Sequence, residues 1–343
     1  MDSSHPTSAE PLPPDQAKYI PVPGNLPPST PPIRVLANLY RSGFDRSPPP
    51  TDRRVLLPVL LFIITCASTY WAMLRPEIVF TDHVLVNGRI GKAIGASGQW
   101  HDAWIYMLCV MGMLLAHEMG HFIQCLRYRI PASLPYFIPM PFTPIGTMGA
   151  VIGMQGSSAD RKQLFDIGIS GPLAGLVVAL PLVWIGIKQA IPFPPEALPQ
   201  YHLQDPLLFQ LLIHYLHPEL PAGQELLINP VLMAGWVGML ITGLNMFPIA
   251  QLDGGHVSYA LFGERGAGWV ARGVMVLSIS YMIFSGVYTW LIMLMLVMYI
   301  GIDHPPTAND RAHLGWGRRI LGLASLLIPI LCFTPNPISL AHR

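Results

Sequence analysis

The chain carries one short pattern whose residue types suit metal-assisted hydrolysis. His117, Glu118 and His121 form an H-E-x-x-H motif inside an apolar stretch. On a helix, positions i and i+4 lie on one face, so the two imidazoles can bind the same Zn²⁺, and Glu118 can accept a proton from the attacking water. With 12 histidines in 343 residues, this motif arises by chance roughly 0.01 times. The motif therefore predicts a zinc site, in preference to histidines that only join helices by hydrogen bonds.

The two histidines leave a tetrahedral zinc site short of one protein ligand. Asp253 is the first charged residue after the apolar run 226–250, and it precedes a glycine pair that frees the backbone. Taken alone, Asp-Gly-Gly is more typical of a turn. Taken with H-E-x-x-H, a carboxylate that completes a His₂/Asp site is the better interpretation. His256 is the rival third ligand, and the spacing alone does not exclude it.

The composition is typical of a membrane protein with several spans. Hydrophobic residue types make up 52% of the chain and charged types 11%, whereas soluble domains carry about a quarter charged residues. The formal net charge of +1 gives no basic footprint for nucleic acid. We therefore expect a lipid bilayer around the chain and no nucleic-acid partner.

Apolar runs predict an all-α polytopic membrane protein with six or seven transmembrane helices. Uncharged runs of about 20 residues or more, the length that a span needs, occur at 55–74, 167–187, 226–250, 273–302 and 320–341. The stretch 103–126 is also apolar and contains H-E-x-x-H. As one helix, 273–302 would measure roughly 45 Å, which exceeds a bilayer core of about 30 Å. We expect Ser285-Gly286 to turn it into a pair of helices.

The segment after the metal-binding helix is apolar but cannot form a regular spanning helix, because four prolines and the glycines at 146, 149 and 153 interrupt 134–156. Non-helical backbone at membrane depth is tolerated only where it is buried in protein or lines a water cavity. We expect a re-entrant loop with 147–154 extended along the site; the alternative is a simple cytosolic surface loop. The extended edge, with Gly146, Thr147, Met148 and Gly149, is the predicted contact for an unwound substrate strand.

Four regions follow from these patterns. Thirteen of the 36 prolines lie in the first 50 residues, which predicts a disordered tail over 1–54, either a plain linker or a ligand for a proline-binding partner. The first transmembrane helix and an outer loop occupy 55–102, the catalytic membrane core 103–260, and the C-terminal transmembrane helices 261–343. Six Lys and Arg residues precede the first run, which puts the N-terminus in the cytosol. No transit peptide is visible, and this favours a bacterial cytoplasmic membrane.

Two motifs together resemble the site-2 protease family of intramembrane zinc metalloproteases. They are H-E-x-x-H at 117–121 and N-x-x-P-x-x-x-L-D-G-G at 245–255, with a glycine-rich span at 168–175 between them. The resemblance implies that Asp253 is the third zinc ligand and Glu118 the general base. It also implies that Asn245 helps to hold the substrate or its developing oxyanion, and that a membrane-embedded β-hairpin follows the metal-binding helix.

The expected function is that of a zinc endopeptidase that cleaves membrane proteins within or near their transmembrane segments, in regulated intramembrane proteolysis. One alternative is a divalent-metal transporter that uses the same His/Asp site. Another is a catalytically inactive scaffold. A transporter needs only ligands, whereas a protease needs an unliganded base, so Glu118 favours the protease.

Two further polar residues receive structural interpretations. Asp166 lies where the span 167–187 begins, and we interpret it as a charge favoured at a helix start. His304 precedes a proline pair, and we interpret it as part of a span terminator, with a regulatory role left open.

Overall fold

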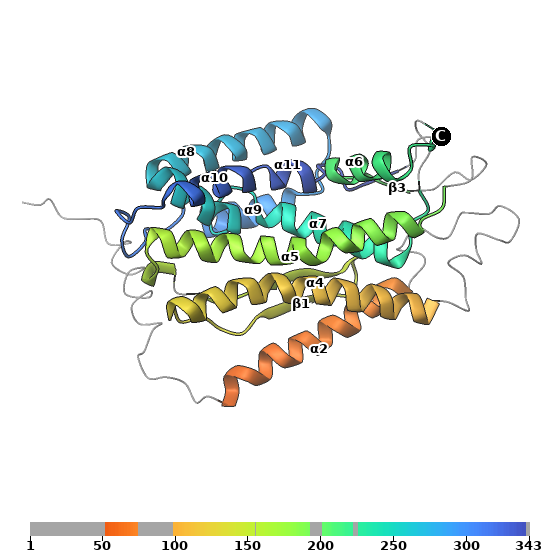
Figure 1. Ribbon diagram of the computed structural model, residues 1–343, viewed down its shortest axis with the longest axis horizontal. Helices are drawn as coiled ribbons and strands as arrows, with labels where there is room; N and C mark the ends of the chain where they lie inside the picture. The colour runs from red at the N-terminus through yellow and green to blue at the C-terminus, as the bar shows by residue number, and fades with distance from the viewer. Residues whose placement is uncertain (1–51, 75–98, 155, 193–200, 222–225, 341–343) are drawn as a thin grey trace, which may run out of the picture. The chain divides into compact units, whose positions relative to one another are not determined.

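The computed structural model describes residues 52–74, 99–154, 156–192, 201–221 and 226–340. The chain divides into two units, Met1–Pro49 and Pro50–Arg343, and every described element belongs to the second. Most of the predicted tail over 1–54, and the outer loop within 55–102, lie outside the described residues. The elements, labelled in Figure 1, are α2 (Asp52–Leu74), α4 (Gln99–Tyr128), β1 (Tyr136–Met140), β2 (Gly146–Val151), η2 (Gly156–Ser158), α5 (Arg161–Gln189), β3 (Tyr201–Leu203), α6 (Leu207–Leu216), α7 (Pro230–Asn245), α8 (Asp253–Ser285), α9 (Leu291–Ile300), α10 (Trp316–Ser325), α11 (Ile328–Cys332) and β4 (Ile338–Leu340).

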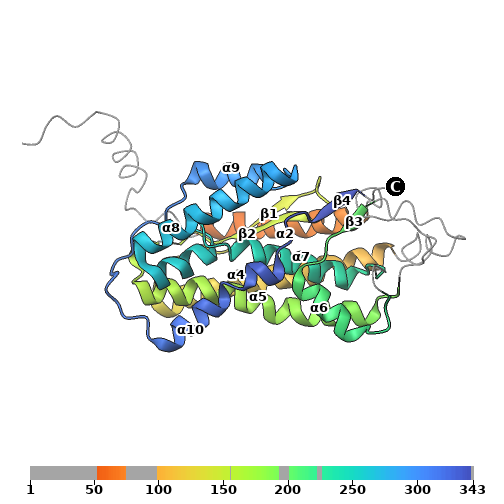
Figure 2. The same cartoon turned by 90° about the horizontal axis from the view of Figure 1, so that it is seen from above.

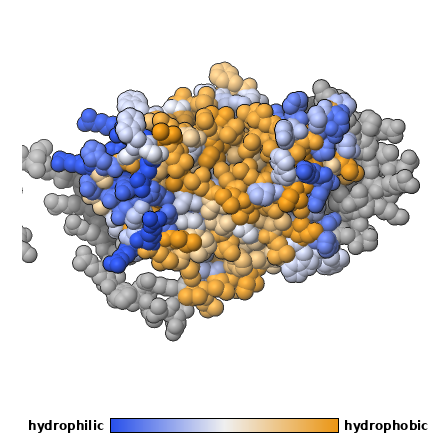
Figure 3. Space-filling view, viewed as in Figure 1, coloured by the Kyte–Doolittle hydropathy of each residue, from blue (hydrophilic) through white to orange (hydrophobic). Residues whose placement is uncertain are grey.

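Four of the described helices, α2, α4, α5 and α8, are long and apolar enough to cross a membrane. Large hydrophobic side chains are exposed on them, among them Leu56, Val177 and Phe284. In Figure 3, hydrophobic residues fill the middle of the visible face, and hydrophilic residues lie toward its two ends. This distribution is the one expected for a protein whose solvent is a bilayer core between two polar interfaces.

The predicted count of six or seven spans is not confirmed for the described residues. The run 226–250 forms α7, which has only 16 residues. Asn229 caps its start by accepting a hydrogen bond from the Leu232 N–H, and Pro230 occupies the first turn. The helix ends at Asn245, so the rest of the run belongs to the turn that leads to Asp253.

The last two predicted spans are also divided. The break predicted at Ser285-Gly286 is confirmed, because α8 ends at Ser285 and Gly286 adopts φ 70°. The helix that follows the break, α9, has only 10 residues. The run 320–341 gives two short helices and strand β4 instead of one helix. Pro329 lies in the first turn of α11, and the prolines at 335 and 337 remove backbone donors beyond it.

Helices α4, α5 and α7 pack against one another and form the core around the H-E-x-x-H motif. Figures 1 and 2 show α4 and α5 running alongside each other, and in Figure 1 α2 lies on the side of α4 away from α8. The side chains buried between these helices include Tyr106, Met113, Phe165, Val183 and Met239. Because α4 is held on two sides, its histidines have fixed positions.

The proline- and glycine-rich segment after α4 forms the hairpin β1–β2, so it is extended as predicted. The strands are antiparallel, and the register shifts between Phe137 and Pro139. The Ser68 hydroxyl of α2 donates to the Gly146 carbonyl (2.6 Å), and the Tyr106 hydroxyl of α4 donates to the Ile145 carbonyl (2.8 Å). These side chains hold the tip of the hairpin against the two helices that precede it.

Helix α8 consists of two arms, because Gly263 has φ 72° and ψ 178°. The first arm, 253–262, carries Asp253 and packs against α5. The Arg161 guanidinium at the start of α5 donates to the carbonyls of Ala260 (2.6 Å) and Leu261 (3.1 Å), near the end of this arm. The arm that supplies the aspartate is therefore fixed to α5 independently of the second arm.

Candidate metal centre

Three side chains from two helices converge inside the protein. The Oδ2 atom of Asp253 lies 3.1 Å from Nε2 of His117, and its Oδ1 atom lies 3.2 Å from Nε2 of His121. The two Nε2 atoms are 3.3 Å apart. His117 and His121 are buried, and all three ligand atoms lie within 4.8 Å of one another, so the group can hold a metal ion.

The hydrogen bonds around the histidines favour a cation among these atoms. His121 Nδ1 donates to the Ile167 carbonyl (2.7 Å), which leaves Nε2 of a neutral ring without a proton. His117 Nε2 faces two groups, the Asp253 carboxylate at 3.1 Å and the Asn245 amide nitrogen at 3.3 Å. Two imidazole nitrogens and a carboxylate therefore face one another, and a metal ion binds to such nitrogens in their unprotonated form. This donor set is the one that Zn²⁺ prefers, and the residues fit the metal.

Glycines on α5 make room for the histidines of α4. A Cβ atom on Gly171 would lie 2.0 Å from Nε2 of His121, and one on Gly175 would lie 3.1 Å from Nδ1 of His117. On the other side of the contact, a Cβ atom on Gly120 would lie 2.5 Å from the Ser170 carbonyl oxygen. The glycine-rich span 168–175 therefore has a steric role: it lets the two helices approach until the imidazoles lie against α5.

The turn after α7 brings Asp253 to the histidines. Ala250 has φ 52°, and the first arm of α8 starts at Asp253. A Cβ atom on Gly254 would lie 2.0 Å from the Met246 carbonyl oxygen, and one on Gly255 would lie 2.3 Å from that of Ala250. The glycine pair is needed because the helix start folds back closely onto the turn that precedes it.

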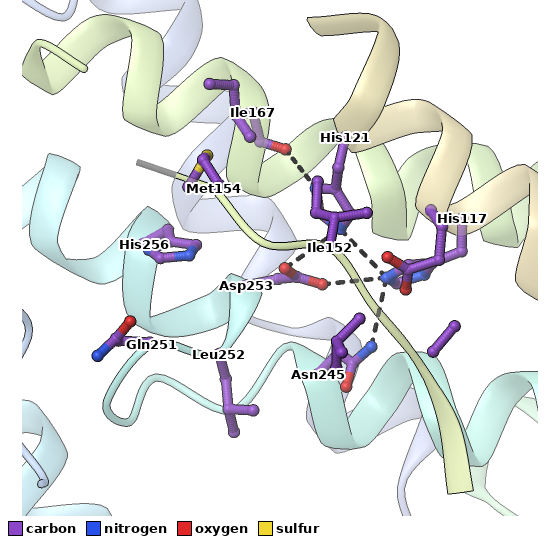
Figure 4. A pocket seen from close by; sticks show the side chains of 13 residues that line it. His117, His121, Ile152, Met154, Ile167, Asn245, Gln251, Leu252, Asp253 and His256 are labelled. Atoms are coloured by element: carbon purple, nitrogen blue, oxygen red, sulfur yellow. Dashed lines mark hydrogen bonds and ion pairs between the residues drawn. The ribbon is translucent and has the colours of Figure 1, made fainter. Parts of the chain in front are cut away.

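A cavity of about 140 Å³ adjoins the ligand group, well above the roughly 15 Å³ that one water needs. Glu118 is buried in its wall and is not one of the three grouped ligands. Asn245 also lines the cavity, with its amide directed at His117 (Figure 4). The structure thus brings together a carboxylate, an amide and the ligand group at one open space.

The hairpin contributes to the cavity through the later part of the segment 147–154, which was expected to lie along the site. The wall contains Ala150, Val151, Ile152 and Met154, the end of β2 and its continuation. The predicted substrate contacts, 146–149, lie earlier on β2 and outside this wall. Within them, Gly146 lies against α2, where a Cβ atom would be 2.6 Å from the Thr69 Cα, and Thr147 is buried with its hydroxyl donating to the Ile138 carbonyl. Met148 is exposed, and Gly149 adopts φ 97°.

His256 also lines the cavity, one helical turn after Asp253. It does not belong to the group whose ligand atoms lie within 4.8 Å of one another. Figure 4 places it on the side of Asp253 away from His117. The geometry therefore favours Asp253 over His256 as the third ligand, the choice that the spacing left open.

The sequence pattern of peptidase family M50 matches residues 105–287, more than half of the chain, including H-E-x-x-H and Asp253. The chain belongs to this family. Membership confirms the resemblance to site-2 proteases that the two motifs indicated. No solved structure matches the chain.

Two curated relatives of this M50 chain are named as probable zinc metalloproteases. It is 27% identical to the probable zinc metalloprotease EGY1, chloroplastic, of Arabidopsis thaliana over 319 residues, which cover 86% of this chain and 56% of that protein. It is 25% identical to the probable zinc metalloprotease EGY2, chloroplastic, of Oryza sativa subsp. indica over 236 residues, which cover 67% of this chain and 42% of that protein. The chain spans about half the length of the curated relatives it matches.

Two interactions near the M50 metal centre could not be predicted from the sequence. The Ile167 carbonyl fixes His121, but a backbone acceptor is not visible in a residue's type. Asp166, interpreted as a charge at a helix start, lies in the second turn of α5, since the helix begins at Arg161. Its carboxylate instead accepts two hydrogen bonds from the Arg318 guanidinium of α10 (2.7 and 2.9 Å) and one from the Tyr128 hydroxyl of α4.

Arg318→Gln is expected to destabilise the protein by about 1–3 kcal/mol, because it leaves the largely buried Asp166 carboxylate without its bidentate partner. The midpoint of thermal unfolding in detergent should fall by about 2–6 °C. Arg319→Gln is the matched control, because its side chain is exposed and lies over the Trp316 ring instead. Equal shifts for the two variants would contradict a special role of the Asp166 pair.

Proposed function

We propose that this chain is a zinc endopeptidase that hydrolyses peptide bonds within or near the transmembrane segments of membrane proteins. One observation carries the proposal: a buried carboxylate, Glu118, lies beside a His₂/Asp ligand group in a cavity wall, on a helix long enough to cross a membrane. Metal-dependent hydrolysis needs these parts together.

The polar groups at and beside the ligand group each have a role in this reaction. Zinc held by His117, His121 and Asp253 would polarise the scissile carbonyl and make the attacking water more acidic. Glu118 accepts a proton from that water and then delivers it to the nitrogen of the leaving amine. The Asn245 amide, already directed at the ligand group, donates to the oxygen that gains negative charge. The Ile167 carbonyl keeps His121 in the tautomer that presents Nε2.

The hairpin would hold the substrate in extended form. A helical segment hides its peptide bonds, so it must unwind locally before the bond reaches Glu118. The segment from Ala150 to Met154, the end of β2 and its continuation, forms one wall of the cavity, and in Figure 4 its ribbon passes beside the ligand group. We place the substrate strand along it, paired through backbone hydrogen bonds. The hairpin then lies at membrane depth, where α2 and α4 hold its tip through hydrogen bonds.

The charges support a topology with the N-terminus in the cytosol, since six Lys and Arg residues precede α2's apolar run. We place the chain in a bacterial cytoplasmic membrane, and we place α7 and α9 at membrane depth as additional partial spans. Protease protection of the N-terminus in inverted and right-side-out vesicles tests the orientation.

Metal removal tests the activity. Purified full-length protein is incubated with a membrane-permeant chelator, dialysed and assayed on a transmembrane model substrate with a Gly- and Pro-softened segment. Cleavage is expected to fall to background and to return when one equivalent of Zn²⁺ is added, because the water and the carbonyl lose their activation without metal. Bound zinc, measured by mass spectrometry, should rise and fall with the rate.

The transporter alternative gives a different result in the same preparation. If zinc binds stoichiometrically and the protein moves zinc across liposome membranes without cleaving any substrate, the protease proposal is wrong. The position of Glu118, in the cavity wall but outside the ligand group, supports hydrolysis, because a transport site has no need of a base held apart from its ligands.

A further inference from the structure

The end of the cavity beyond Asp253 has its own polar group. His256 lies there, together with Met154, Gln251 and Leu252 (Figure 4). The proposed chemistry uses Glu118, Asn245 and the three ligands, and it gives His256 no task. Nevertheless α5 leaves space for this side chain, since a Cβ atom on Gly168 would lie 2.8 Å from the His256 Cβ.

Two hydrogen bonds fix the tautomer of His256. Nδ1 of His304 lies 2.6 Å from the Pro305 carbonyl, which can only accept, so this nitrogen carries a proton. Burial holds the pKa of His304 below its usual value, which keeps the ring neutral and leaves its Nε2 as an acceptor. Nδ1 of His256 lies 2.6 Å from that acceptor and must donate to it. A neutral His256 then has an unprotonated Nε2, the nitrogen that is not used by His304, on a side chain that lines the cavity.

The loop that supplies His304 is attached firmly enough to maintain this arrangement. The His304 ring packs on the Tyr259 ring, with centroids 4.6 Å apart. The Tyr259 hydroxyl donates to Asp310 (3.0 Å), and the Thr307 hydroxyl donates to the same carboxylate oxygen (2.6 Å). The Ala308 N–H donates to the Ala159 carbonyl (2.9 Å), so the loop is also joined to the segment just before α5.

We propose that the cavity end formed by Met154, Gln251, Leu252 and His256 is a substrate subsite that selects a residue with a hydrogen-bond donor, and that His256 Nε2 accepts this bond. The inference rests on the proposed function. A substrate strand that follows 150–154 past the ligand group reaches His256 on one side of the scissile bond. A hydroxyl or amide side chain at that position pairs with the bare nitrogen, whereas an aliphatic one leaves it buried and unpaired.

The test uses pairs of substrates that differ by Thr or Val at one position, with the cleaved bond located by mass spectrometry. Each of the four positions on either side of the bond is varied in turn. At one position, wild type is expected to cleave the Thr substrate with a kcat/KM about 3- to 10-fold above that of the Val substrate. In His256→Leu this ratio should fall to about one, and in His304→Leu it should fall partly, because His256 is then free to protonate Nε2.

Two control variants sharpen the result. His214→Leu replaces an exposed histidine of α6 and should leave both the rate and the ratio unchanged. Gln251→Leu removes the other hydrogen-bonding side chain of the subsite. If the ratio is lost in Gln251→Leu and kept in His256→Leu, the amide makes the contact and the inference about His256 is wrong.

A spectrum of the ¹⁵N-labelled histidines reads the tautomer without any turnover. We expect His256 with a protonated Nδ1 and a bare Nε2 in wild type; a protonated Nε2 would overturn the inference. Equal cleavage of Thr and Val substrates at every position would also overturn it, while the proposed function would stand. If wild type cleaves none of the substrates, the proposed function is wrong and the subsite falls with it.

Discussion

Glu118→Gln is expected to bind zinc as the wild type does and to cleave a membrane substrate at least about 100-fold more slowly. The amide keeps the size of the carboxylate but cannot take a proton from water. Glu118 is not one of the three grouped ligand residues, so the metal content should not change. The measurements are bound zinc per chain and kcat/KM on the model substrate, for both proteins in the same detergent.

A matched control separates this effect from a general change of charge. Glu264→Gln replaces an exposed glutamate just beyond the bend of α8 and should keep both the zinc and the rate of wild type. If Glu118→Gln retained its cleavage rate with full zinc, Glu118 would not be the base. If it lost its zinc, Glu118 would act as a ligand, and the assignment of Asp253 would need revision.

The sequence was sufficient to place His117 and His121 together on one face of α4, because the four-residue spacing of H-E-x-x-H has one geometric meaning on a helix. The third ligand was harder to choose. Asp253 and His256 are one helical turn apart on the same arm, so spacing cannot separate them. The fold distinguishes the two residues. The first arm of α8 starts at Asp253, which contacts the histidines of α4, whereas His256 lies against Gly168 of α5.

The remaining differences arise from features that residue type does not encode. Apolar runs predicted spans correctly where one helix continues through the whole run, as in α2 and α5. Helix α5 continues although it contains Pro172 and Pro181. The prediction failed at 320–341, where prolines divide the run. The hairpin was predicted, but the register of its two strands was not, and neither was the fact that the residues lining the cavity begin only at Ala150.

The close packing of the α5 glycines against the histidines allows the position of the metal centre to be tested. Gly171→Ala is expected to lose its zinc and, with it, all cleavage. The new methyl group would lie 2.0 Å from Nε2 of His121, the atom that must bind the metal. The clash can be relieved only if the imidazole turns away or α5 moves from α4, and overpacking of this kind costs about 1–3 kcal/mol. Either movement removes one of three protein ligands.

Neighbouring glycines give a graded series with a control. Gly175→Ala places its methyl group 3.1 Å from His117 Nδ1, so a smaller loss of zinc affinity is expected. Gly112→Ala meets nothing within 4 Å on the exposed side of α4, and it should keep full zinc while the helix gains up to about 1 kcal/mol. Zinc is measured by competition with a chromophoric chelator, and helix content by circular dichroism. Because all three changes add the same methyl group, an order of zinc loss other than Gly171, Gly175, Gly112 would mean that the histidines do not bind metal where they lie against α5.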